Sequence, residues 1–288
     1  MSATTTRFGS GQAVQRLEDD QLLKGQGVYA ADVVPEGQTR LCFVRSPYAH
    51  ARIVSVDTSV AEKMPGVRLV LSGPALAAKG VKPMPRAMNF TRADGSPLAA
   101  ADRRVLAADR VRYVGEAVAA VVADTEQQAR DACEAVAITY DELPCVVTLA
   151  DALAANAPTL SDAPDNRVAE TRYGDTAAAA KAFAEAAHVV QLDLVNQRLV
   201  AFTIEPRTVL AYPQEGRLLI RMSSQMPTAV RGVVSDVLGL KAEQVRVLVG
   251  DVGGGFGMKT GPYPEDVLVA YAAHQLQCAV KWVADRGE

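Results

Sequence analysis

The chain has 288 residues, of which 49% are hydrophobic and 22% charged, and this composition is typical of a globular protein of about two domains. Its formal net charge of −3 gives no reason to expect nucleic acid or an anionic membrane as a partner. No run approaches the roughly 18 apolar residues of a transmembrane helix. Residues 1–14 are polar and small, without the apolar region of a secretory signal, and predict a disordered or strap-like start.

In the first half, short apolar runs rich in β-branched residues predict strands. These runs lie at 40–45, 53–57, 67–71, 117–123 and 136–140. The run at 117–123 is apolar on both faces and predicts a central strand. Helical patterns at 60–64 and 126–135 separate some of the strands, and the stretch 77–101 predicts a long loop.

In the second half, residues 149–165 are rich in Ala, Pro, Ser and Asp and predict a linker between two domains, 15–148 and 166–288. Helices are predicted at 175–187, 227–238 and 263–276, and strands at 188–194, 209–212, 217–222, 245–249 and 279–283. The last strand has no following element to cover it, so we expect its edge to be bare. A chain completed by another chain, or a fragment, would explain such an edge.

The four cysteines contain no C-x-x-C pair, so we expect no zinc or iron–sulfur site in this chain and interpret each cysteine as a small core residue. They stand at Cys42, Cys133, Cys145 and Cys278. The three histidines are scattered without metal-ligand spacing. A reducing, cytoplasmic setting fits this usage.

The most informative motif is Gly253-Gly254-Gly255-Phe256-Gly257, which follows an apolar strand directly. Glycine allows positive φ and close approach of another molecule, and unpaired N–H groups in such a loop can hold an anion or the oxygens of a cofactor. We expect Phe256 to be buried and to anchor the loop. A tight turn without a ligand is the alternative, and the spacing is not the GxGxxG of a dinucleotide site.

Two further segments are expected to meet this loop. Ser223-Ser224-Gln225 follows one predicted strand and precedes a helix, and Ile204-Glu205-Pro206-Arg207 lies in an apolar stretch. Strand ends followed by helix starts form ligand crevices in such sheets. The carboxamide of Gln225 could bind an oxygen atom of a ligand, or Gln225 could be a satisfied turn residue.

The order of these motifs resembles the N-terminal portion of the large subunit of the molybdenum hydroxylases, the family of xanthine dehydrogenases, aldehyde oxidases and aerobic carbon monoxide dehydrogenases. The similar segments are Leu22–Tyr29, Phe43–Ala51, Tyr113–Ala119, Tyr140–Pro144, Asn196–Arg198, Ile204–Arg207, Ser223–Gln225, Val252–Lys259 and Tyr263–Arg286. The resemblance implies a mixed α/β (α+β) fold. An α/β hammerhead-type domain would be followed by the incomplete first part of a molybdopterin-binding domain.

The resemblance also implies roles for matched residues. Gln225 would hydrogen-bond an oxygen ligand of the molybdenum, and the backbone of Gly254, Gly255, Phe256 and Gly257 would pass against the metal and its pterin. The pterin sulfurs would hold the metal, in a cofactor that bacterial members suggest is the cytosine dinucleotide form. FAD and 2Fe-2S clusters would lie on partner chains, an FAD-binding medium subunit and an iron–sulfur small subunit.

Family features without a match are the active-site loop and the glutamate that acts as general base, both expected beyond Glu288. The resemblance implies an oxidoreductase that transfers water-derived oxygen to an aldehyde, an N-heterocycle or carbon monoxide, and that is inactive without the missing C-terminal half of the subunit. Thr260 stands where the xanthine-oxidising branch carries a glutamate, so purine oxidation is disfavoured. The alternative is a non-catalytic remnant or an assembly module of the same family.

Overall fold

The computed structural model describes residues 16–86, 90–92, 94–160 and 165–288. The expected strap at 1–14 and part of the expected linker at 149–165 lie outside these residues. The α-helices are α1 (Asp19–Leu23), α2 (Gly73–Ala78), α3 (Glu126–Glu134), α4 (Leu149–Leu153), α5 (Thr176–Glu185), α6 (Pro227–Leu238) and α7 (Pro264–Leu276). The strands are β1 (Thr39–Arg45), β2 (Ala51–Asp57), β3 (Val67–Ser72), β4 (Arg110–Val111), β5 (Ala117–Ala123), β6 (Ala137–Glu142), β7 (Thr208–Gln214), β8 (Arg217–Met222), β9 (Val245–Leu248) and β10 (Val280–Val283).

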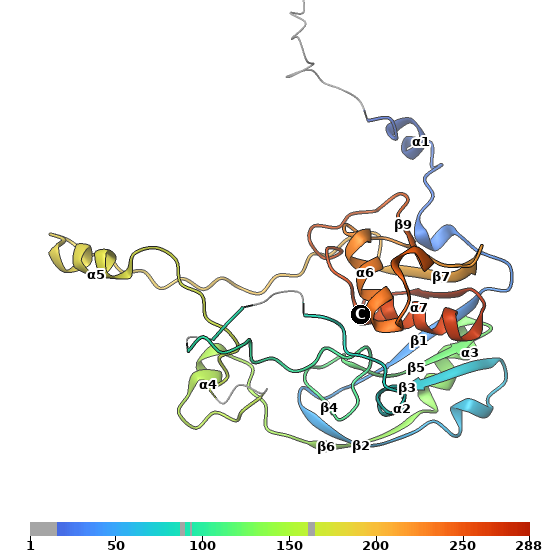
Figure 1. The fold of residues 1–288 in the computed structure, drawn as a ribbon, viewed down its shortest axis with the longest axis horizontal. Helices are drawn as coiled ribbons and strands as arrows, with labels where there is room; N and C mark the ends of the chain where they lie inside the picture. Colours follow the sequence, from blue (N-terminus) through green and yellow to red (C-terminus); the bar gives the residue numbers. More distant parts are fainter. Residues whose placement is uncertain (1–15, 87–89, 93, 161–164) are drawn as a thin grey trace, which may run out of the picture.

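One seven-stranded sheet joins the two halves of the chain, in the order β3-β5-β1-β10-β7-β8-β9. Three of these strands come from the first half and four from the second (Figure 1). The junction is the parallel pair β1–β10, in which Thr39 stands opposite Val280. A smaller sheet, β4-β2-β6, contains strands of the first half only. The mixed α/β class expected from the sequence is confirmed.

Helices cover both faces of the large sheet. On β5, Ala119 and Val121 pack in a cluster with residues of α3, while Ala120 and Val122 pack in the cluster that contains α6 and α7. Because alternate residues of a strand point to opposite faces, α3 and α7 lie on opposite sides of this strand. All seven residues of β5 are buried, as a strand covered on both faces requires.

The expectation of a bare last strand is wrong. β10 pairs with β1 on one side and antiparallel with β7 on the other, so neither of its edges is free. Trp282 of β10 is buried and meets the ring of Phe43 edge-on, with centroids 5.5 Å apart. The strand next to β10 comes from a segment about 240 residues earlier, which no local pattern near the end of the chain indicates.

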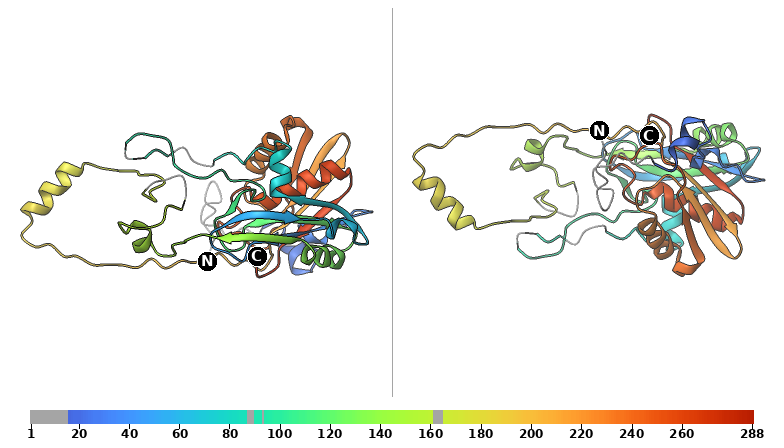
Figure 2. Two further views of the ribbon diagram at one scale, coloured as in Figure 1. Left: turned by 90° about the horizontal axis from the view of Figure 1, so that it is seen from below. Right: turned by 90° about the horizontal axis from the view of Figure 1, so that it is seen from above.

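Two other local expectations fail. The run 188–194 forms no strand and is exposed throughout, in a segment that extends away from the sheets together with α5 (Figure 2). Apolar alternation alone is insufficient here, because no neighbouring strand supplies ladder hydrogen bonds. Cys145 is exposed instead of packed in the core, and the other three cysteines are partly buried. Among the described residues, no helix has both the length and the apolar character needed to cross a membrane.

Candidate functional site

The glycine-rich loop connects β9 to α7 and is partly open to solvent. Gly254, Phe256 and Gly257 have φ values of +100°, +49° and +89°. Phe256 is 81% exposed, so the expectation of a buried anchor is wrong. The left-handed backbone of Phe256 lies between two glycines with positive φ, Gly254 and Gly257. Two other segments of the chain hold this loop in place. Glycine adopts such φ values without strain, whereas Phe256 adopts one in spite of its side chain.

Gln225 provides the first attachment of the loop. Its side-chain Oε1 accepts a hydrogen bond from the Gly257 N–H at 3.1 Å, and its own N–H donates to the carbonyl of Lys259 at 2.8 Å. A Cβ atom on residue 255 would stand 2.6 Å from the same Oε1. The segment after β8 and the loop therefore lie in direct contact, and a side chain at 255 would have to displace the carboxamide of Gln225.

Glu205 provides the second attachment. Its Oε2 accepts hydrogen bonds from the Gly253 N–H at 2.7 Å, from the Ser223 hydroxyl at 2.7 Å and from the Lys259 ammonium at 2.9 Å. Glu205 is 9% exposed and Lys259 only 2%. The three segments singled out by the sequence are therefore brought together. The Glu205–Lys259 ion pair was not anticipated. The available signal was an acidic residue in one and a basic residue in the other of two segments that were expected to meet, 204–207 and 252–259.

Several hydrogen-bond donors of the loop are left without a partner. Within the described parts of the chain, no hydrogen bond is made by the backbone N–H groups of Gly254, Gly255 and Phe256. The Nε2 group of Gln225 also makes no hydrogen bond to the described residues. The other side-chain atom, Oε1, is the one that binds the loop. Such a group of donors suits oxo or anionic oxygen atoms, and it carries no charge of its own.

The protein side chains near the loop do not form a metal site by themselves. Among the described residues, no group of three or more His, Cys, Asp or Glu side chains is placed to hold a metal ion. The unpartnered donors fit a cofactor that carries its own metal ligands.

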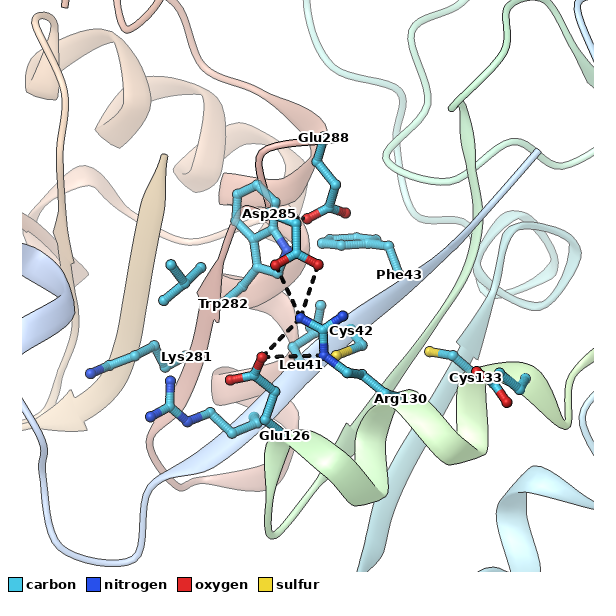
Figure 3. Close-up of a pocket in the computed structure, with 13 residues that line it drawn as sticks. Leu41, Cys42, Phe43, Glu126, Arg130, Cys133, Lys281, Trp282, Asp285 and Glu288 are labelled. Carbon is cyan, nitrogen blue, oxygen red and sulfur yellow. Dashed lines mark hydrogen bonds and ion pairs between the residues drawn. The ribbon is translucent and has the colours of Figure 1, made fainter. Parts of the chain in front are cut away.

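A hollow of about 280 Å³ lies away from the loop, between β1, β10 and α3 (Figure 3). Arg130 of α3 crosses it and forms ion pairs with Glu126 and Asp285, each at 2.9 Å. Burial raises the pKa of Cys42 to about 11 and that of Cys133 to about 12. Both thiols are therefore protonated at neutral pH and are poor nucleophiles. Residues 253–257 do not line this hollow. Because its thiols are poor nucleophiles and Arg130 is already paired with two carboxylates, the glycine loop is the better candidate for a functional site.

Comparison with known proteins assigns two regions of the chain to two family models. Residues 24–144 match the model of the aldehyde oxidase and xanthine dehydrogenase a/b hammerhead domain, and residues 160–288 match that of the molybdopterin cofactor-binding domain. The glycine loop and Gln225 lie in the second match. The boundaries 15–148 and 166–288 taken from the sequence stay a prediction.

Individual relatives belong to the same group. The chain is 38% identical to the nicotine 6-hydroxylase large subunit of Paenarthrobacter nicotinovorans over 100% of this chain, and 35% identical to the carbon monoxide dehydrogenase large chain of Hydrogenophaga pseudoflava over 94% of it. It spans 35% and 34% of the length of these two relatives.

Solved structures agree with the fold. Quinoline 2-oxidoreductase from Pseudomonas putida 86 superposes with a TM-score of 0.81 at 33% identity, over 95% of this chain and 34% of that one. A copper- and molybdenum-containing carbon monoxide dehydrogenase gives a TM-score of 0.83 at 33% identity, over 96% and 35%. The chain therefore belongs to the molybdenum hydroxylase family of xanthine dehydrogenases, aldehyde oxidases and carbon monoxide dehydrogenases, and corresponds to part of their molybdopterin-binding large subunit.

Proposed function

We propose that this chain forms part of the catalytic large subunit of a molybdenum-dependent oxidoreductase, and that the glycine loop together with Gln225 holds its molybdopterin cofactor. One observation carries the proposal: three unpartnered backbone N–H groups and one free carboxamide donor lie on two segments in direct contact. When bound, the cofactor supplies the metal at which water-derived oxygen is transferred to the substrate.

The residues of the chain bind and orient this group. Because Oε1 of Gln225 is occupied by the Gly257 N–H, the carboxamide presents its Nε2 donors to an oxygen atom of the cofactor. The backbone of Gly254, Gly255 and Phe256 adds further neutral donors. Neutral donors stabilise anionic oxygens without placing a full charge beside the metal, which would shift its potential.

The remaining elements of the activity lie outside this chain in the proposal. The general base and the active-site loop would belong to the rest of the large subunit, whether in the same or in a separate chain. FAD and the 2Fe-2S clusters would be carried by a medium and a small subunit, in the cytoplasm. The cofactor would be the cytosine dinucleotide form. The substrate would be an aldehyde, an N-heterocycle or carbon monoxide, and Thr260 disfavours purines.

The test measures the cofactor directly. The protein is purified from its native host with whatever chains copurify, and its molybdenum and pterin contents are determined for the wild type and for Gln225→Glu. We expect about one molybdenum per large subunit in the wild type and a loss of about tenfold or more in the variant, since a carboxylate repels anionic oxygens.

Two outcomes would contradict the proposal. A wild-type complex without pterin would favour the non-catalytic assembly module. Stoichiometric metal together with turnover in this chain alone would show that no further part of the subunit is needed. Gly261→Ala is the matched control, because residue 261 has open space around it and lies outside the proposed contacts.

A further inference from the structure

The ion pair between Glu205 and Lys259 is buried directly beneath the glycine loop. Lys259 Nζ contacts both the carboxylate of Glu205, at 2.9 Å, and the backbone carbonyl of the same residue, at 3.0 Å. It is one of the largest fully buried side chains among the described residues. Burying two charges costs free energy that a stabilising role alone explains poorly, because an apolar pair of similar volume is often as stable.

The hydrogen bonds of the Glu205 carboxylate all join segments of the candidate site. Its Oε2 binds the loop at Gly253, Ser223 directly after β8, and the loop's last residue, Lys259. Its Oε1 is buried and has no hydrogen-bond partner in the part of the chain that the structure describes. One carboxylate oxygen therefore ties both ends of the loop and the segment that carries Ser223 and Gln225 to a single point. The segment that follows Glu205 in the chain leads into β7 of the central sheet.

The backbone at Gly253 leaves no room for a side chain. A Cβ at position 253 would stand 2.5 Å from the Cβ of Glu205, so the loop backbone lies against this side chain. Between the two tied ends, Gly254, Gly255 and Phe256 keep their N–H groups unpartnered. Holding the loop at Gly253, Gly257 and Lys259, with the donors of residues 254–256 free, is a way to preorganise a binding site.

We propose that Glu205 and Lys259 are positioning residues, which hold the glycine loop and Gln225 in the geometry that receives the anionic oxygens of the cofactor before the cofactor binds. This inference rests on the proposed function for the identity of the ligand, but the loop geometry that it assigns to the pair exists without one. The pair acts through the backbone and does not itself touch the ligand.

The test compares Glu205→Gln, Lys259→Met and the double variant Glu205→Gln/Lys259→Met in the complex as purified. Three quantities are measured: the melting temperature, the pterin and molybdenum content, and amide hydrogen exchange of peptides that cover Gly253–Lys259. Each single variant leaves one group buried without its ionic partner, so we expect both to melt at lower temperature. The double variant removes this imbalance, and we expect its melting temperature to return toward that of the wild type.

The distinguishing result lies in the double variant. We expect it to retain about tenfold less pterin than the wild type and to exchange the hydrogen-bonded loop amides, those of Gly253, Gly257 and Met258, faster although it is folded. Lys281→Met is the matched control, because Lys281 is also buried but donates to the carbonyls of Ala31 and Val33 and to none of residues 253–259. That variant should keep the cofactor and the slow loop exchange.

A double variant that is as stable as the wild type, keeps its pterin and protects the loop equally well would overturn the inference and leave the pair with a purely structural role. If the wild type itself holds no pterin, the proposed function fails. The exchange rates of the loop amides then still decide whether the pair positions the loop, so the two failures can be told apart.

Discussion

At the scale of single residues, the candidate site depends on the absence of side-chain atoms at position 255. A methyl group there would collide with the carboxamide of Gln225, at 2.6 Å from Oε1 and 2.7 Å from Cδ. The carboxamide is the atom group that ties the loop to β8 and also offers the free Nε2 donors. A single added carbon would therefore act on both the loop and the proposed ligand contact.

We predict that Gly255→Ala displaces the Gln225 side chain and breaks its hydrogen bond to Gly257, lowers the free energy of unfolding by about 1 kcal/mol and strongly reduces cofactor content. The measurements are the urea midpoint and the pterin content of the purified complex. Gly261→Ala, at a position without neighbours within 4 Å, should change neither quantity appreciably. Full cofactor content in Gly255→Ala would mean that the carboxamide position is not required.

The sequence allowed part of this site to be predicted. Four glycines in five positions and Gln225 after a strand were sufficient to select the two segments, and the structure places them in contact. The exposed ring of Phe256 could not be anticipated, because the apolar character of a residue predicts that it is buried. The sequence does not reveal the left-handed backbone that Phe256 adopts. The partner of Glu205 lies 54 residues away, and no spacing rule identifies such a pair.

At the scale of elements, the start of α7 contains a buried carboxyl group. Asp266 accepts a hydrogen bond from the Tyr263 N–H at 2.9 Å, which caps the helix. Burial raises its pKa to about 7, although the hydrogen bond from Tyr263 and the charge of Arg207 act in the opposite direction. Its neighbour Glu265 has a lowered pKa, because Arg207 and Arg45 both form ion pairs with it and outweigh its burial.

We predict that Asp266 makes the protein less stable as the pH rises from about 4 to about 7. The unfolded chain loses this proton near pH 4, whereas the folded chain keeps it until about pH 7, so the free energy of unfolding falls over this window, by at most about 4 kcal/mol. Asp266→Asn stays neutral and still accepts the bond from Tyr263. Its melting temperature should therefore depend less on pH between 4 and 7.

The exposed pair Arg68–Asp124 offers a control for this prediction, since Asp124→Asn removes a carboxylate from the surface. That variant should follow the wild-type pH dependence closely. An Asp266→Asn profile parallel to the wild type would show that Asp266 is ionised in the folded protein throughout the window.

The sequence was more informative about elements than about their neighbours. The strands of the large sheet follow from short β-branched runs, and α3 from its Thr125 cap, whose hydroxyl accepts from the Gln128 N–H. Pairing partners do not follow from these patterns. β10 lies between a strand of the first half and one of the second, whereas the equally apolar run 188–194 finds no partner among the described residues.

At the scale of the whole molecule, the large sheet makes the two halves of the chain interdependent. β1 and β10 are paired, and the main apolar cluster includes Leu41 and Leu71 from the first half together with Ile220 and Leu268 from the second. The two regions that match separate family models are thus parts of one folded body. We expect neither half to fold independently, because each would expose a long unpaired strand edge.

The segment between α5 and β7 is, in contrast, unprotected. Between residues 188 and 200 every residue is exposed, and Val190 and Val195 are each 92% exposed. The described contacts of this segment are few, among them the bond from Arg198 to the carbonyl of Val147. An apolar segment this exposed is typical of a surface that another chain or chain segment covers.

We predict that thermolysin cleaves the isolated chain first within 188–200, and that the two fragments still elute together from a size-exclusion column because the paired strands β1 and β10 hold them. Mass spectrometry identifies the cut, and the fragments should separate only in denaturant. In the complex with the proposed partner chains, the same segment should resist cleavage for at least about tenfold longer, since proteolysis follows the population of accessible conformations. Equal cleavage rates with and without partners would mean that this segment is not part of an interface, and fragments that separate without denaturant would contradict the continuous sheet.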